Sequence, residues 1–164
     1  MDKDINEQLL KTSEDGNVNE VMELLKIGAD TETIDVHGWT PLILASHNGH
    51  AEVIKLLLDC NANIEAKTYN GNTSLIFSAH CDSTRITKLL LENCADITVT
   101  NIFGKTCLSA YRSSTSTWDE EYIQELIINK QPHNIKFFDD RIGILPSLRE
   151  KYKDIIELSL MGLF

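Results

Sequence analysis

Residues 35–42, Asp35-Val-His-Gly-Trp-Thr-Pro-Leu, return twice along the chain in altered but recognisable form. The later copies are Thr68-Tyr-Asn-Gly-Asn-Thr-Ser-Leu and Asn101-Ile-Phe-Gly-Lys-Thr-Cys-Leu, so the starting positions 35, 68 and 101 are each 33 residues apart. Self-similarity at one fixed period of this length is typical of a stacked repeat array and not of a single closed globule. The chain of 164 residues therefore reads as a series of similar units.

Three positions of each copy have a physical reason to recur. The glycine predicts a tight turn with positive φ, which glycine adopts without a steric penalty. The threonine two residues later predicts a helix N-cap, and Pro41 suits the first helical turn because no N–H donor is needed there. The residues in register are Gly38, Gly71 and Gly104, then Thr40, Thr73 and Thr106, then Leu42, Leu75 and Leu108.

The remainder of the unit predicts two short helices. The first helix follows Thr40 and ends at Gly49, where the left-handed conformation suits glycine. The second helix is more apolar, contains Leu57-Leu58, and ends at Asn61-Ala-Asn. The same apolar pair recurs at 24–25 and 90–91, followed by Gly-Ala-Asp and Cys-Ala-Asp. Each unit is thus a turn, a helix, a turn, a second helix and an extended link.

This unit resembles an ankyrin repeat. The residues that carry the resemblance are Asp35, Gly38, Thr40-Pro-Leu, Gly49-His50 and Leu57-Leu58, with Ile43 where that family usually has a histidine. The resemblance implies an all-α fold, an ankyrin-type α-solenoid of helix-turn-helix repeats with projecting turns. We expect the array to span residues 1–130, with an N-terminal cap at 2–34, repeats at 35–67 and 68–100, and an irregular unit at 101–130.

The later units depart from the pattern in stated ways. Ser74 and Cys107 replace the proline, and Asp82 occupies the helix-end glycine position, which aspartate tolerates better than most residues. A three-residue insertion near Ser114–Trp118 precedes a second helix expected around Glu120–Asn129. In residues 2–34 the turn signature is missing, but Leu9 aligns with Leu42 and Gly16 aligns with Gly49.

Residues 131–164 predict a helical C-terminal cap over the last repeat. Pro132 stops the preceding helix, residues 135–144 carry Phe137 and Phe138, and Pro146 interrupts the chain again. Ser147-Leu-Arg-Glu150 has the form of a capping box at the start of one amphipathic helix over 147–160. Two alternatives remain open: a detachable helix that binds a partner, and the start of an F-box, for which too few residues follow.

Composition and charge indicate which classes of partner and location to expect. The formal net charge is −10, and residues 1–35 hold ten acidic and three basic side chains. An acidic surface repels phosphate backbones, so we expect no nucleic-acid partner. The acidic start is either a solvated cap or a patch that attracts a basic partner. No apolar stretch has the length of a membrane span and no signal peptide is evident, so we expect a cytoplasmic, or nuclear, monomer without membrane contact.

The sequence predicts no catalytic, cofactor or metal site. There is no phosphate-binding glycine loop and no nucleophile elbow, and Asp119-Glu-Glu121 is explained by the helix dipole. The four cysteines follow no disulfide or zinc spacing, and we expect Cys60 and Cys94 to be reduced, half-buried packing residues. His50 is expected to bond backbone groups between repeats. The protein is therefore not expected to be an enzyme.

The resemblance implies that partners bind on the concave side formed by the turn tips and first helices. On this chain the corresponding positions are Val36, His37, Trp39, His47, Asn48 and Lys67, then Tyr69, Asn70, Asn72, His80, Cys81 and Thr100, then Ile102, Phe103, Lys105 and Ser113. The large apolar residues among them are typical anchors of protein interfaces. The alternative is that they pack against neighbouring turns, which is the favoured reading for Phe103.

We therefore predict a non-enzymatic protein-binding module, an adaptor or an inhibitor, whose partner is a protein of unknown identity. The alternative is a targeting subunit whose C-terminal helix recruits other machinery, such as a ubiquitin ligase component.

Overall fold

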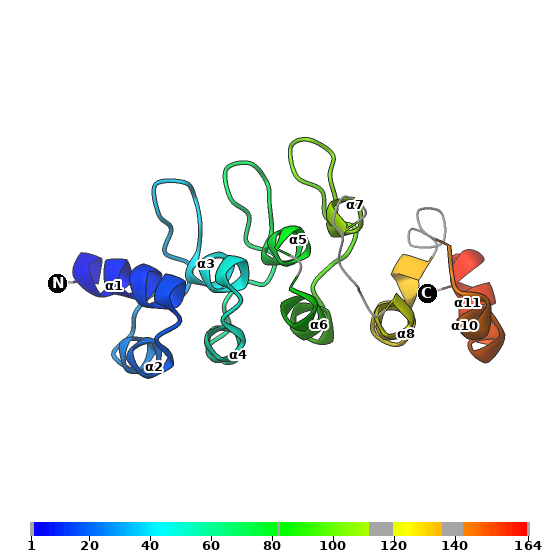
Figure 1. Ribbon diagram of the computed structural model, residues 1–164, viewed down its shortest axis with the longest axis horizontal. Helices are drawn as coiled ribbons and strands as arrows, with labels where there is room; N and C mark the ends of the chain where they lie inside the picture. Colours follow the sequence, from blue (N-terminus) through cyan, green and yellow to red (C-terminus); the bar gives the residue numbers. More distant parts are fainter. Residues whose placement is uncertain (1, 82, 112–119, 136–142, 164) are drawn as a thin grey trace.

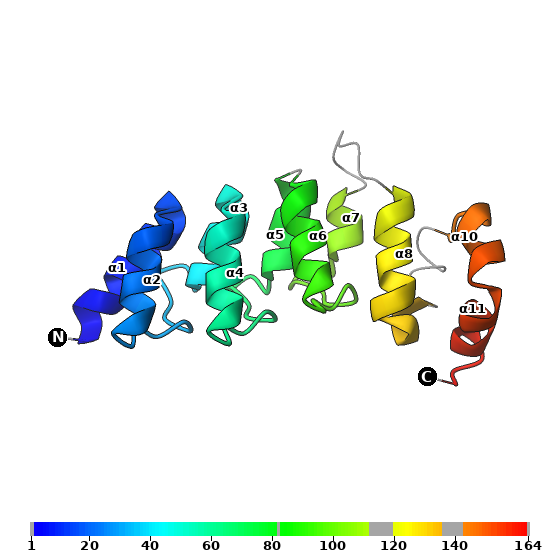
Figure 2. The same cartoon turned by 90° about the horizontal axis from the view of Figure 1, so that it is seen from below.

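The computed structural model describes residues 2–81, 83–111, 120–135 and 143–163, and it shows an elongated stack of helices in two rows (Figure 1). One row contains α1 (Asp2–Asp15), α3 (Pro41–Asn48), α5 (Ser74–His80) and α7 (Cys107–Tyr111). The other contains α2 (Val18–Lys26), α4 (Ala51–Asp59), α6 (Thr84–Glu92) and α8 (Glu120–Lys130). We call the row that begins with α1 the inner row and the row that begins with α2 the outer row. Within each row, neighbouring helices pack side by side (Figure 2). The predicted all-α solenoid is confirmed.

The predicted helix caps are present. The Thr40 Oγ1 atom accepts a hydrogen bond from Ile43 N at 3.3 Å, and Thr73 Oγ1 accepts one from Ile76 N at 3.4 Å. Pro41 takes the first position of α3, and Gly49 ends that helix with φ 81° and ψ 23°. These contacts satisfy N–H groups that a helix start leaves unpaired. The local signals of the repeat therefore form the helices that they predicted.

The segments that follow the outer helices share a backbone conformation that their recurring sequence did not predict. Gly28, Asn61 and Cys94 stand 33 residues apart and all have positive φ, at 92°, 62° and 65°. Each follows the outer helix of its unit, where a left-handed residue turns the chain out of the helix. The expectation of half-buried cysteines is wrong, because Cys60 and Cys94 are both exposed on these turns. Asp82 and the insertion at 114–118 lie outside the described residues.

The core lies between the two rows. Leu42, Leu75 and Leu108 are buried at equivalent places of successive units, and so are Leu57 and Leu90. These side chains belong to one continuous apolar cluster that runs through the stack. Each unit thus buries its apolar faces against its neighbours, as stacked repeats require.

The N-terminal unit docks through His50, as predicted for that residue. The His50 Nε2–H group donates to the carbonyl of Glu14 at 2.9 Å. The ring lies against Gly16, which has φ 76°, so closely that a Cβ at this position would be 2.4 Å from His50 Nδ1. Leu9 is fully buried in the same cluster as Leu42.

The C-terminal helices differ from the sequence prediction. α10 (Pro146–Lys151) begins after Leu145 without a side-chain cap, so the predicted capping box is wrong. Ser147 is itself a residue of α10, and its hydroxyl donates to Glu121 Oε1 at 3.2 Å. The single helix predicted over 147–160 is divided, because Tyr152 has φ −119° and ψ 30° and separates α10 from α11 (Lys153–Leu160). Because the helix is interrupted at Tyr152, α11 points in a new direction. It contacts the short 3-10 helix η1 (Pro132–Asn134).

Two kinds of contact join the C-terminal segment to the repeats. Leu148 and Ile156 are buried in the same apolar cluster as Ile123 and Ile127 of α8. Gln131 is also buried, and its Nε2 group donates to the Ala95 carbonyl at 2.6 Å. Phe137 and Phe138 lie outside the described residues. The division of the chain into an array and a cap at residue 130 stays a prediction.

Candidate functional site

Three loops project from the inner row of helices and form what we call the hairpin row, residues 35–39, 68–72 and 101–105 (Figure 1). Each loop closes by one backbone hydrogen bond between its first and last residue. Asp35 N donates to Trp39 O at 3.1 Å, Thr68 N to Asn72 O at 3.0 Å, and Asn101 N to Lys105 O at 3.0 Å. The three hairpins therefore share one backbone design.

The first side chain of a hairpin holds its tip in place. The Asp35 Oδ1 atom accepts hydrogen bonds from His37 N and Trp39 N, both at 2.8 Å. Asn101 Oδ1 makes the same pair of bonds in the third hairpin, from Phe103 N at 2.9 Å and Lys105 N at 3.0 Å. Side chains of this type stabilise turns by bonding backbone groups two residues ahead. These bonds constrain the first and third tips without any contact from a partner.

Neighbouring hairpins stack on one another at the turn glycines. Ile102 N donates to the Asn70 carbonyl at 3.1 Å, and Asn101 Nδ2 donates to Asn72 Oδ1 at 2.8 Å. A Cβ at Gly71 would lie 3.1 Å from both Asn101 Cα and Ile102 N. The glycine thus serves the close approach of the next hairpin as well as the positive φ of 74°.

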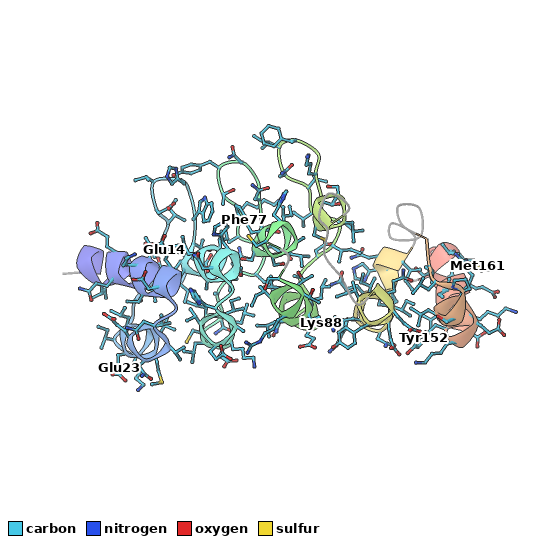
Figure 3. The ribbon with its side chains drawn as sticks, viewed as in Figure 1. Glu14, Glu23, Phe77, Lys88, Tyr152 and Met161 are labelled. Carbon is cyan, nitrogen blue, oxygen red and sulfur yellow. The ribbon has the colours of Figure 1, made fainter. Side chains whose placement is uncertain are left out.

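Four apolar side chains of the hairpin row face solvent. Val36, Tyr69 and Ile102 occupy the same register position and are 85%, 67% and 65% exposed. Phe103 is 70% exposed, so the packing role favoured for it is wrong. Figure 3 shows side chains extending from the projecting loops, away from the helical core. Several exposed apolar groups on one edge of a protein are typical of an interaction surface, whereas apolar residues scattered singly over a surface are ordinary.

Trp39 belongs in part to the scaffold. Its ring centroid lies 4.5 Å from that of Phe77 and 5.1 Å from that of His47, and the side chain is half-buried. Phe77 comes from α5 of the next unit, so this aromatic group joins two repeats (Figure 3). Asn72 is likewise half-buried and bonded to Asn101. For these two residues, the packing alternative has support.

The other predicted positions lie at the surface. His37, Lys67, Asn70 and Lys105 are exposed on or beside the hairpins. His47, Asn48, His80, Cys81 and Thr100 are also exposed, although His47 contacts Trp39 and Asn48 Nδ2 donates to the Leu44 carbonyl at 3.0 Å. Ser113 lies outside the described residues.

A groove of about 540 Å³, which we call the N-terminal groove, adds residues that the sequence analysis missed. Its lining is Glu7 and Leu10 from α1, Ile34, Asp35 and Val36 from the first hairpin region, and Tyr69 from the second. Ile34 has the same register position as Lys67 and Thr100, so the repeat register could have identified it. Leu10 could not be found in this way, because the turn signature is missing from its unit.

Acidic side chains join the base of one hairpin to the next unit. Glu32 Oε1 accepts from Asn63 N at 2.8 Å, and Glu65 Oε1 accepts from Asp96 N at 2.7 Å. Partial burial raises the pKa of Glu65 above its ordinary value of 4.5, an effect that the Asp96 N–H opposes and the Asp96 carboxylate reinforces. Ionising Glu65 is therefore less favourable in the folded protein than in the unfolded chain.

Replacing Glu65 by glutamine should make the stability of the protein less dependent on pH. The folded state binds the Glu65 proton more tightly than the unfolded state, so wild-type stability falls as pH rises from about 4.5 through the raised pKa. Glu65→Gln keeps an oxygen for Asp96 N and removes the charge. Its free energy of unfolding should exceed that of the wild type at neutral pH, with no such gain at pH below 4, in urea titrations. A gain that is the same at both pH values would contradict this account.

The described residues contain no metal-binding cluster, and their buried cysteine is not a reactive thiol. No group of three or more His, Cys, Asp or Glu side chains in that part of the chain could hold a metal ion. Burial raises the pKa of the Cys107 thiol to about 12, so it stays protonated and unreactive at neutral pH. None of the helices over the described ranges is long and apolar enough to cross a membrane.

Comparison with known proteins agrees with this geometry. A family model described as ankyrin repeats, in three copies, matches residues 9–108. The matched span begins inside α1 and ends inside α7, so it includes most of the N-terminal unit and all three hairpins. None of the curated proteins compared with the chain matches it in sequence.

Proposed function

The chain belongs to the ankyrin repeat family, whose repeats generally mediate protein–protein interaction, and from that premise we propose that it binds a protein partner along the hairpin row. The family is generally non-enzymatic. An adaptor and an inhibitor would both use such a surface, since each acts by holding another protein in place.

The observation that carries this proposal is the solvent-facing set Val36, Tyr69, Ile102 and Phe103 on a row of ordered hairpins. Side chains of this size exposed in water gain free energy when a partner buries them, roughly 1–3 kcal/mol each. The hydrogen bonds that the Asp35 and Asn101 side chains accept hold the first and third tips, so less entropy is lost there on binding. His37, Asn70 and Lys105 add polar groups around the anchors.

Charge supports a partner with a basic patch. Residues 5–36 of the described chain contain eight acidic and two basic side chains. The basic ones are already paired, Lys11 with Glu14 and Asp15, and Lys26 with Glu23. An acidic end of this kind accelerates the encounter with a basic partner more than it tightens the complex. A monomeric state and a cytoplasmic or nuclear location stay predictions.

The alternative role, a targeting subunit that recruits other machinery through its C-terminal helix, also stays a prediction. The end of α11 exposes Leu158, Leu160, Met161 and Leu163, which is the surface that such a role would use. The buried side chains Leu148 and Ile156 support a packing role for the same segment. The two roles are compatible only if the exposed face alone contacts the second partner.

The proposed function is tested by the double variant Ile102→Ala with Phe103→Ala. We expect it to retain roughly a tenth or less of the partner that the wild type captures from cell extract, measured by quantitative mass spectrometry of pull-downs. Its thermal stability should change by less than about 0.5 kcal/mol, because both side chains are exposed.

The matched control is Ile27→Ala. Ile27 is as exposed as Ile102, at 65%, but follows α2 in the row away from the hairpins. This variant should capture partners as the wild type does. Equal capture by the wild type and the hairpin variant would remove the case for the hairpin row.

A further inference from the structure

We infer that the N-terminal groove binds a segment of the partner protein in which an aliphatic or aromatic side chain stands beside lysine or arginine. This inference rests on the proposed function and names the chemistry of the partner at one end of the hairpin row. It follows from the shape, the apolar lining and the charge of the groove.

The groove is built from three separate elements, namely α1, the first hairpin region and the second hairpin. Glu7 and Leu10 come from α1, and Tyr69 comes from the second hairpin. The Tyr69 ring lies against Gly38, where a Cβ would be 2.8 Å from Tyr69 Cδ1. The volume of about 540 Å³ lies within the ordinary range for a binding site.

The apolar part of the lining indicates what the partner supplies first. Ile34, Val36 and Tyr69 are all exposed large hydrophobic residues, and they converge on this one groove. Water on these surfaces would be displaced by an aliphatic or aromatic side chain, which is the usual anchor at an interface. A purely polar segment would leave the three side chains without that gain.

The charge of the groove indicates the neighbouring residue. Two of the six lining residues are carboxylic acids, Glu7 and Asp35, and none of the six is lysine, arginine or histidine. The Asp35 Oδ1 atom accepts from His37 N and Trp39 N, and a carboxylate accepts further bonds through its other oxygen. A lysine or arginine of the partner would be attracted by these two carboxylates, and its aliphatic stem would cover the apolar lining of the groove.

The third hairpin indicates which substitution removes the charge of Asp35 without disturbing its turn. Asn101 stands at the position of Asp35 and makes the same two bonds to its own turn. Asp35→Asn therefore keeps the turn and removes its charge. Glu7→Gln removes the second charge of the groove and keeps a side chain of the same size on α1. The double variant Ile34→Ser with Val36→Ser removes apolar lining and leaves both carboxylates in place.

The test is selection of displayed random short peptides on the immobilised full chain, followed by fluorescence anisotropy with the enriched peptides. We expect enriched peptides to combine an apolar residue with an adjacent lysine or arginine. Glu7→Gln with Asp35→Asn should weaken their binding roughly fivefold and reduce its salt dependence. Ile34→Ser with Val36→Ser should weaken it roughly tenfold or more. Ile102→Ala with Phe103→Ala, at the far end of the row, should leave it within about twofold.

The opposite results separate this inference from the proposed function. Failure to enrich any peptide, enrichment without basic residues, or affinities unchanged by both groove variants would each overturn the inference. Peptides that lose affinity only with Ile102→Ala and Phe103→Ala would overturn it and leave the hairpin row as the binding surface. Circular dichroism melts of every variant identify any loss of binding that comes from unfolding.

Discussion

Leu148→Ala is expected to lower the free energy of unfolding by about 2–5 kcal/mol. Leu148 is 1% exposed and lies in the apolar cluster that includes Ile123 and Ile127 of α8. Truncating it removes buried apolar surface and leaves a cavity between α10 and the last outer helix. Urea titrations followed by circular dichroism would measure the change.

Leu158→Ala is the matched control in the same C-terminal segment. Leu158 is 42% exposed on α11, so its truncation should change the free energy of unfolding by less than about 0.5 kcal/mol. A large effect at 148 with a small one at 158 would establish that the C-terminal helices cover the array. Small effects at both positions would contradict the packing described here and favour a detachable arm that recruits other machinery.

Gly71→Ala is expected to destabilise the protein by about 2–5 kcal/mol. A side chain at φ 74° costs about 1–2 kcal/mol by itself, because the left-handed region crowds Cβ against the backbone. The new Cβ would also lie 3.1 Å from Asn101 Cα and Ile102 N, which are backbone atoms of the next hairpin and cannot rotate away. Such overpacking adds about 1–3 kcal/mol.

Gly104→Ala separates these two contributions. Gly104 has φ 68°, but no described atom lies within 4 Å of its Cβ position. This variant should cost only the conformational part, about 1–2 kcal/mol. Thermal melts of the two variants would therefore differ, with the Gly71 variant the less stable. Equal destabilisation would mean that the second hairpin moves aside freely and that the hairpins do not support one another.

The repeated unit was predictable because its signals are local. A threonine N-cap needs only the N–H groups of its own helix, and Gly49 needs only a left-handed backbone to end α3. The same reasoning failed where a local pattern had a competitor. Ser147 fits a capping box in sequence, but Pro146 starts α10 one residue earlier and the Ser147 hydroxyl bonds Glu121 instead.

The candidate site was predictable by position and not by role. The 33-residue register placed Tyr69 and Ile102 on projecting turns, and they are exposed there. Trp39 has the same kind of placement, yet its ring packs against Phe77 of the next unit. Whether a large side chain on a hairpin serves packing or binding depends on the distance to the neighbouring unit, which a repeat pattern does not contain.

The sequence by itself predicted the helix-turn-helix unit and the positive φ of the turn glycines, because both follow from backbone geometry within a few residues. Its motif residues also carried the resemblance to the ankyrin repeat family, which the family model bears out. The stacking of Asn101 on Gly71, the burial of Leu148 and the N-terminal groove came from the folded arrangement. These features join residues from different units, and their free energy depends on how closely the units approach one another. A surface assembled from three elements, as at Leu10, Ile34 and Tyr69, exists only once the stack has formed.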